Sequence, residues 1–462
     1  MTGPGQYHRG MALRRFGTFT GGIDLHDDKE ATLDAAIVPI GLLERLCVPL
    51  AMVDAPPARM VVQVGQAVAQ GERLAAGDGE QVDVFAPLAG KVAGLGRVRL
   101  PAAGGAWRNA PAVVLTETAE PAPLRPLPDG YEWQAADAAS LRHRIAEGGL
   151  TTFRDPVVSL AGWIDRAGEA GADILIANFL ENTPFITADH RLLTEHGSEV
   201  IRGLAILARA TGITQVFLAA DARWTGGYRA AVGPSRLYGI EPFEMSHKYP
   251  IGADAIVTRV LTRRTVEPGQ RPLDVRVAIT DAATCWAAYR WVACGERVAG
   301  RVVTVSGAAV GRPGNYLVPF GAACAEVLAL AEAEPDQPAV YGSAMNGRQV
   351  VENATVGPAC NGLLAPRAPE LGQPTPCIRC GWCVDNCPAR LNVSGLNDDF
   401  ELGRVERAHR RGALACVDCG ICSYVCPARL PLTHRVGMLK AAIRAENGRM
   451  EQNNHLCRDE HR

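Results

Sequence analysis

The sequence predicts a multidomain protein of α/β and β architecture, and three observations lead to this fold class. The chain has 462 residues, more than one compact hydrophobic core normally serves. Residues 45–118 alternate small apolar and polar residues between glycine turns, as half-buried β-strands do. Residues 136–255 alternate strand and helix patterns, and eight of the 14 cysteines fall between Cys377 and Cys426. Each stretch therefore predicts a separate domain.

The composition excludes several classes of protein. Basic and acidic residues nearly cancel, 47 against 49, which weighs against a general nucleic-acid binder. The most apolar stretch, residues 204–220, is interrupted by polar residues before it could span a membrane, and residues 1–22 lack the apolar core of a signal peptide. Without export, disulfides explain clustered cysteines poorly. We therefore expect the chain in a reducing cytoplasm.

Residues 1–44 are expected to form an irregular leader, followed by a β domain at 45–120. The run from Val61 to Val92 resembles the biotinyl or lipoyl type of barrel-sandwich hybrid domain. Such domains carry a cofactor on a lysine at a hairpin tip, and no lysine lies near the expected tip at 77–81. We therefore interpret Lys91, which lies in the following strand, as structural.

After a proline-rich linker at 120–135, residues 136–268 are expected to form a layered α/β domain with a mostly parallel sheet. Asp155-Pro156 resembles a helix start, with an N-cap followed by proline. The other expected elements are a buried strand at 173–177, a helix at 187–211 that stops at Gly212, and a strand at 215–219.

Residues 269–350 are expected to form a second α/β unit, which resembles a β-grasp ligand-binding domain. The unit would begin with a strand at 275–279, continue with a helix capped by Asp281, and include a strand at 301–307. Residues 370–440 form the cysteine-rich part, expected to be helical, and 441–462 are expected to form a polar, frayed tail.

The cysteine-rich part contains two complete C-x2-C-x2-C-x3-C-P motifs, the spacing of bacterial two-cluster ferredoxins. Three cysteines at intervals of three can surround one cubane cluster. The fourth is expected to start a helix, with proline at the first helical position, and to bind the other cluster. The predicted ligands of one [4Fe–4S] cluster are Cys377, Cys380, Cys383 and Cys426, and those of the other are Cys416, Cys419, Cys422 and Cys387.

Zinc and disulfides are the alternatives to clusters. A zinc site takes four ligands as two pairs, which would leave a third cysteine of each series unused. Two clusters that share their ligands have no open position for a substrate. We therefore expect electron relay, with no catalytic residue, rather than catalysis at iron.

The loop between the two motifs contains a group of arginines at positions 404, 407, 410 and 411. They can form a solvated helix face. Alternatively, they can form a docking patch for an acidic ferredoxin or a partner subunit, because charge steers encounter.

Nearly the whole chain resembles the C subunit of Rnf-type (Rsx) ion-translocating electron-transport complexes. The similar segments are Phe19 to Ile23 with Lys29-Glu30, Thr187 to Leu193, Tyr249 to Gly252, Arg301 to Gly307, and Pro313 to Gly321, together with the cysteine motifs. The resemblance implies a complex-I-like α/β domain whose glycine-rich loop binds FMN and NADH.

This chain departs from that flavin site at two places. The corresponding loop, Gly148 to Arg154, lacks most of the glycines through which bare N–H groups approach phosphate. In the family's acidic loop, here Asn178 to Phe185, Glu181 remains and Phe179 replaces a glycine. We therefore regard FMN and NADH as doubtful cofactors and expect the two clusters alone.

The sequence thus predicts an electron-transfer subunit of an Rnf-like complex, relaying electrons between a donor and partner subunits. It would be peripheral to the cytoplasmic face of the inner membrane, attached only through partners that can include a ferredoxin. The alternatives are an NADH-oxidising FMN and iron–sulfur subunit, and a stand-alone adaptor that serves a dedicated soluble enzyme.

Overall fold

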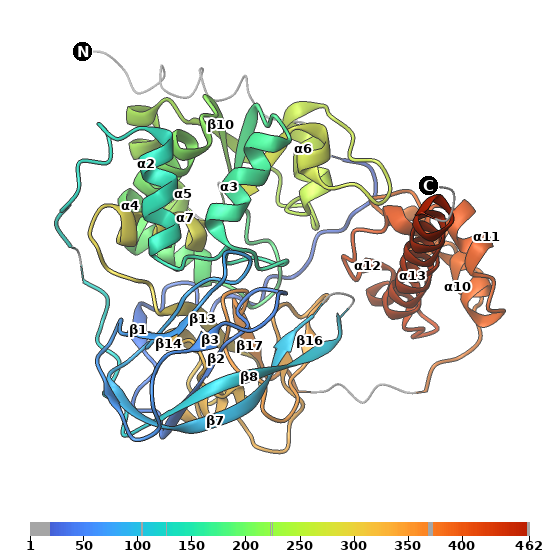
Figure 1. Cartoon of the computed structure of the whole chain (residues 1–462). Coiled ribbons are helices and arrows are strands. Elements are labelled where there is room, and N and C mark those ends of the chain that lie inside the picture. Colours follow the sequence, from blue (N-terminus) through green and yellow to red (C-terminus); the bar gives the residue numbers. More distant parts are fainter. Residues whose placement is uncertain are drawn as a thin grey trace, which may run out of the picture. The chain divides into compact units, whose positions relative to one another are not determined.

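The computed structural model describes residues 19–102, 105–125, 127–221, 223, 225–367 and 373–459 (Figure 1). The chain divides into two compact units. Among the described residues, the first comprises 26–247 and 272–367, and the second comprises 19–25, 248–271 and 373–459. The chain therefore enters the second unit three times.

The strands and helices are as follows. The strands are β1 (Ile37–Pro39), β2 (Arg45–Pro49), β3 (Arg59–Met60), β4 (Ala67–Val68), β5 (Arg73–Ala76), β6 (Val84–Phe85), β7 (Gly90–Pro101), β8 (Trp107–Thr116), β9 (Ile174–Phe179), β10 (Gln215–Asp221), β11 (Glu241–Met245), β12 (Val277–Thr280), β13 (Gly300–Ser306), β14 (Gly314–Pro319), β15 (Val340–Tyr341), β16 (Arg348–Gln349) and β17 (Gly362–Leu364). The helices are α2 (Ala138–Glu147), α3 (Leu160–Glu169), α4 (Ala188–Thr211), α5 (Thr225–Ser235), α6 (Asp254–Thr262), α7 (Ala282–Val292), α8 (Cys324–Leu330), α9 (Trp382–Asp385), α10 (Val393–Glu401), α11 (Val405–Arg410), α12 (Ile421–Tyr424) and α13 (Leu432–Asp459), with 3₁₀ turns η3 (Arg236–Tyr238), η4 (Pro272–Val275) and η5 (Ala413–Ala415).

The predicted β domain consists of two small antiparallel sheets, β2-β8-β7-β4 and β3-β5-β6. The long pair β7 and β8 is visible at the base of the first unit (Figure 1). Leu46, Leu74 and Leu115 are fully buried and share one core with the strand β13 of a neighbouring sheet. Lys91 lies in β7, half exposed, with its ammonium 3.7 Å from the Glu117 carboxylate.

The α/β domain contains a parallel sheet in the order β11-β10-β9-β12. The helix expected at 187–211 is α4, and it stops at Gly212, which adopts a left-handed φ of +71°. The helix expected to start at Asp155 begins instead at Leu160. There the Ser159 hydroxyl accepts a hydrogen bond from the Gly162 amide, because serine is a strong N-cap residue.

The expected boundary at residue 269 is wrong for one strand and one helix. β12 pairs in parallel with β9, so it completes the first α/β sheet rather than opening a second unit. All four residues of β12 and every residue of α7 are buried. Periodicity identified both elements, but it carries no information about which sheet edge a strand joins.

A six-stranded sheet follows in the order β1-β14-β13-β17-β15-β16. Its edge strand β1 comes from the expected leader and pairs in parallel with β14. β17 lies beyond the expected end at residue 350 and pairs with β13. Residues 37–39 of the expected leader therefore belong to the same sheet as β13 and β14.

The second unit packs α9 to α13 around the cysteine motifs (Figure 1). α13 extends to Asp459, so residues 441–459 of the expected frayed tail are helical, whereas 460–462 and 1–18 lie outside the described residues. Val436, Leu439 and Ile443 follow helical spacing and are buried against the other helices.

Gly203 is the closest contact between α4 and α7, and it generates a stability prediction. A Cβ atom at this position would lie 1.7 Å from the Cys285 carbonyl oxygen. We expect Gly203→Ala to lower the free energy of unfolding by about 1–3 kcal/mol, because the helices must separate. Gly168→Ala on α3 faces open space, so urea denaturation should show no loss for this control.

Candidate metal centres

Two similar loops present the cysteines. In the first loop Arg379 and Gly381 adopt left-handed φ angles of +58° and +84°. In the second loop Asp418 and Gly420 adopt φ angles of +54° and +83°. These residues turn the backbone between successive cysteines, and the left-handed conformation costs least at glycine.

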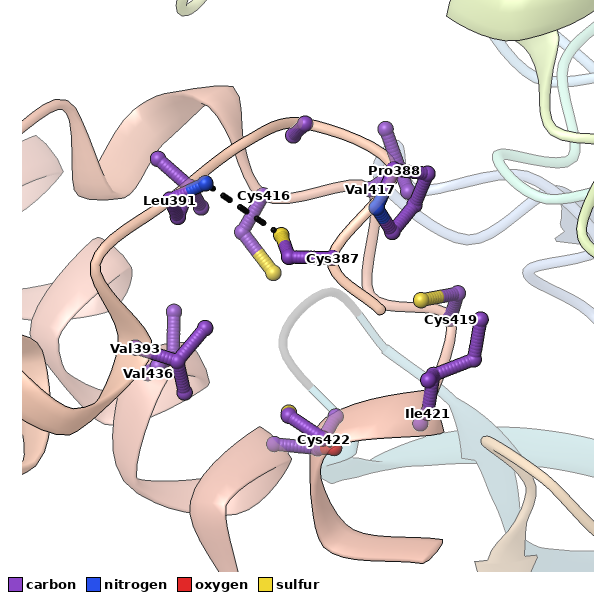
Figure 2. Close-up of a pocket in the computed structure, with 13 residues that line it drawn as sticks. Cys387, Pro388, Leu391, Val393, Cys416, Val417, Cys419, Ile421, Cys422 and Val436 are labelled. Carbon is purple, nitrogen blue, oxygen red and sulfur yellow. Dashed lines mark hydrogen bonds between the residues drawn. The ribbon is translucent and has the colours of Figure 1, made fainter. Parts of the chain in front are cut away.

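The eight cysteines line two pockets in two sets of four. One pocket is lined by Cys377, Cys380, Cys383 and Cys426, and the other by Cys387, Cys416, Cys419 and Cys422. Figure 2 shows the second set surrounding a common space. The fourth cysteine of each motif therefore lies with the first three of the other motif, and the structure brings together the two sets that the spacing predicts.

The fourth cysteines do not start helices, contrary to the expectation. Cys387 and Pro388 lie in a turn that is closed by the Arg390 amide donating to the Cys387 carbonyl, and α10 begins later at Val393. The turn leaves the Leu391 amide free to donate to the Cys387 sulfur at 3.4 Å (Figure 2). A donor of this kind stabilises a bound thiolate.

The cysteines of the two pockets differ in their exposure to solvent. Cys380 is exposed beside the exposed side chains of Ile378 and Trp382, whereas Cys419 is buried. The buried Tyr249 donates its hydroxyl to the Cys419 carbonyl at 2.6 Å.

The N-terminal segment of the same unit covers the Cys387 turn. The Gly22 amide donates to the Asn386 carbonyl at 2.9 Å. A Cβ at Gly21 would lie 2.5 Å from the Cys387 carbonyl oxygen, so glycine is required there. Sequence reasoning noted these glycines and Tyr249 only as family-like segments and assigned them no role.

The thiols suit metal binding rather than free thiolate chemistry. Burial raises the pKa of Cys383 to about 11 and that of Cys419 to about 12, so neither ionises alone near neutral pH. Bound metal displaces such protons and supplies the compensating charge. Four sulfurs around each cavity therefore fit an iron–sulfur cluster.

Two of the arginines in the group at 404, 407, 410 and 411 have a structural role. Arg407 and Arg411 each lie 3.3 Å from the buried Asp399 carboxylate and so join α10 to the segment that follows it. Arg410 pairs with Glu406 on the surface. Arg404 and Arg410 therefore fit the solvated-face interpretation, whereas Arg407, although exposed, and Arg411 pair with a buried carboxylate.

The loop at 148–154 in the first unit does not form a phosphate cradle. The Thr152 amide donates to the Val158 carbonyl at 2.9 Å, and the Phe153 amide donates to the Thr284 hydroxyl at 2.8 Å. A Cβ at Gly149 would lie 2.6 Å from the Asp83 carbonyl, so this glycine permits close packing on the β domain. These residues do not fit an FMN phosphate.

Glu181, the remaining acid of the second loop, caps a helix. Its two carboxylate oxygens accept the backbone amides of Asp189 and His190 at 3.0 Å each, at the start of α4. Both oxygens of this carboxylate therefore already accept hydrogen bonds within the protein.

A cavity of about 810 Å³ adjoins the 148–154 loop. Its walls include Phe85, Arg290 and Arg297. Both arginines already interact with other side chains of the protein. Arg290 pairs with Glu296 and lies 3.5 Å from Glu199, and Arg297 stacks 4.1 Å from the Phe85 ring.

Within the part of the chain that the structure describes, no helix has both the length and the apolar character to cross a bilayer.

Three family models match the chain. They are the RnfC barrel sandwich hybrid domain over residues 17–120, the Nuo51 FMN-binding domain over 163–290, and the 4Fe–4S dicluster domain over 367–430. The predicted barrel-sandwich, complex-I-like and two-cluster parts of the fold are thereby confirmed.

Curated relatives cover most of the chain. The C subunit of an ion-translocating oxidoreductase complex from Rhodobacter capsulatus is 29% identical to this chain, over 94% of this chain's length and 84% of its own length. Its counterpart from Yersinia pestis is 31% identical over 92% of this chain and 69% of its own. The C subunit of a proton-translocating ferredoxin:NAD(+) oxidoreductase complex from Clostridium ljungdahlii is 26% identical over 82% of this chain and 84% of its own.

Among solved structures, an NAD+-reducing [NiFe]-hydrogenase in the H2-reduced state aligns with a TM-score of 0.48 and 15% identity, over 68% of this chain and 62% of that chain.

Asp189 gives the α/β domain a pH dependence. Burial raises the pKa of its carboxyl to about 7, although Arg301 at 3.8 Å opposes the shift. Between the ordinary pKa of about 3.9 and this value, the folded chain holds a proton that the unfolded chain releases, so stability falls as pH rises and levels off above about 7.

Asp189→Asn should reduce the fall in Tm between about pH 5.5 and 8. A pH profile as steep as that of the control, the exposed Glu352→Gln, would contradict this assignment.

Proposed function

The chain belongs to the family of C subunits of ion-translocating oxidoreductase complexes, and we propose that its two four-cysteine pockets each bind one [4Fe–4S] cluster. It is an electron-transfer subunit of an Rnf-type complex. When bound, the clusters supply two one-electron carriers. The observation that carries the ligand assignment is the crossed lining of the pockets, in which Cys387 lies with Cys416, Cys419 and Cys422.

The remaining residues of the second unit hold the ligands in place. The left-handed backbone at Gly381 and Gly420 orients the cysteine loops, and Tyr249 ties the second loop to the inserted segment 248–271. The exposed Cys380 loop offers a route for electrons in or out of the unit.

We further propose that the chain attaches to a membrane only through other subunits of the complex, at its cytoplasmic face, and that a ferredoxin is one candidate redox partner. The relatives whose names describe parts of such complexes support this proposal.

A second candidate function is an NADH-oxidising FMN and iron–sulfur subunit, which the match of residues 163–290 to the Nuo51 FMN-binding domain favours. The backbone amides of Thr152 and Phe153 already donate hydrogen bonds within the protein, which argues against FMN binding at this loop. We therefore propose that electrons enter this subunit from another donor.

Cluster content tests the main proposal. Anaerobically purified chain should contain about eight iron and eight sulfide per chain, because two cubanes have that composition. Bound zinc without sulfide would reject the proposal.

The crossed ligation has its own variant. We expect Cys387→Ala to damage the Cys416, Cys419 and Cys422 cluster more than the cluster of its own motif, as read by EPR. Cys47→Ala, outside both pockets, should leave both signals unchanged, and the reverse pattern of damage for Cys387→Ala would refute the assignment.

The flavin question is decided by stoichiometry and by the reductant. The isolated chain should contain far less than one FMN per chain, and NADH should not bleach the clusters, whereas dithionite should reduce them. Flavin near one per chain, or bleaching of the clusters by NADH alone, would instead support the NADH-oxidising function. The 810 Å³ cavity would then be the candidate flavin site.

A further inference from the structure

The two cluster motifs form an internal repeat whose equivalent positions differ in chemistry. Counted from the first cysteine of each motif, Arg379 is equivalent to Asp418, and Glu401 is equivalent to Lys440. The sign of the charge is therefore reversed at both positions.

The cation at the second site is buried, whereas Asp418 is half exposed. Lys440 is 5% exposed, and its ammonium donates to the Cys416 carbonyl at 2.7 Å and pairs with Asp418. At the first site Glu401 is half exposed and pairs with Arg435 at 2.6 Å. Each site thus carries paired charges, Lys440 with Asp418 at the second site, and Arg379 with Asp398 and Glu401 with Arg435 at the first. At the second site the buried member of the pair is the cation.

A hydroxyl group adds a second difference. The Ser423 hydroxyl accepts from the Thr433 amide at 2.9 Å and donates to the Thr433 hydroxyl oxygen at 3.0 Å. The hydroxyl proton of Thr433 is therefore available to the Cys422 sulfur, which lies 3.3 Å from the Thr433 hydroxyl oxygen. A metal-bound thiolate has no proton of its own, so Thr433 must be the donor.

The first site has no equivalent donor. Val384 stands in place of Ser423, and Ser394 stands in place of Thr433. The Ser394 hydroxyl donates to the Asn392 side chain at 3.1 Å instead of to a sulfur.

The hydrogen bond from Thr433 and the Lys440 ammonium act in one direction on the redox equilibrium, and the Asp418 carboxylate, next to Cys419 in the sequence, acts in the other. Reduction makes a cluster more negative, and a nearby cation or a hydrogen bond to a ligand sulfur stabilises that form. Coulomb attraction to Lys440 is weakly screened because the ammonium is buried. We infer that Thr433 raises the reduction potential of the cluster held by Cys387, Cys416, Cys419 and Cys422 above that of the other cluster, and that Lys440 offsets the lowering effect of the Asp418 carboxylate.

This inference rests on the proposed function, since it requires that both clusters bind. It makes the buried site the one that retains the electron and the exposed Cys380 site the one that exchanges it. Lys440 and Thr433 act through the ligands and the local field, and neither is itself a ligand.

EPR-monitored redox titration of the full chain, reconstituted anaerobically, tests the inference. Lys440→Met should lower the reduced fraction of the buried cluster at fixed potential, changing its reduced-to-oxidised ratio about tenfold, or about 59 mV for one electron. Thr433→Val, which keeps the side-chain shape, should lower the ratio in the same direction. The signal is assigned to the buried cluster by its loss in Cys387→Ala.

Lys440→Arg should restore most of the lost ratio, and Ser394→Ala, the matched change at the first site, should leave both midpoints unchanged. Unchanged midpoints in Thr433→Val and Lys440→Met, with both clusters present, would overturn the inference and leave the proposed function intact. Absence of clusters from the wild-type chain would overturn the proposed function itself. If Lys440→Met fails to assemble clusters, Thr433→Val decides the outcome.

Discussion

The second unit depends on one constraint, namely that four thiols must point into each of two small cavities. No regular helix or strand directs residues spaced three apart toward one point at such short range. The chain meets the constraint with left-handed backbone at Arg379 and Gly381, and again at Asp418 and Gly420. The longer helices α10 and α13 begin only after these loops and turns are complete. The strained loops are therefore held from outside by helices that pack on one another.

The same constraint explains why distant segments join this unit. Buried loop carbonyls need hydrogen-bond donors, and the cysteine motifs do not supply all of them. The Tyr249 hydroxyl serves the Cys419 carbonyl, the Gly22 amide serves Asn386, and the Lys440 ammonium serves Cys416. Electrostatics and hydrogen bonding at the buried site thus come partly from residues that lie far from the motifs in sequence.

The first unit combines the fold of an FMN-binding type of domain with a loop whose amides are hydrogen-bonded within the protein. The parallel sheet and α4 are intact, but the amides that would face a phosphate donate within the protein. The glycine at 149 is still required, because a Cβ would collide with the β domain. Gly149 therefore serves packing, and Glu181 serves as a helix cap.

The sequence alone determined the two cluster motifs, the crossed sets of four cysteines, the elements at 173–177, 187–211 and 215–219, and the family, because these depend on local spacing and periodicity. It misplaced the helix start at Asp155 and the start of α10, where hydrogen bonds of Ser159 and Cys387 decide the boundary. Only the tertiary structure assigned β12 to the parallel sheet of the α/β domain, β1 to the six-stranded sheet, and Thr433, Lys440 and Tyr249 to the buried site. The physical reason is that strand partners and hydrogen-bond donors are chosen by three-dimensional proximity, which residue spacing does not encode.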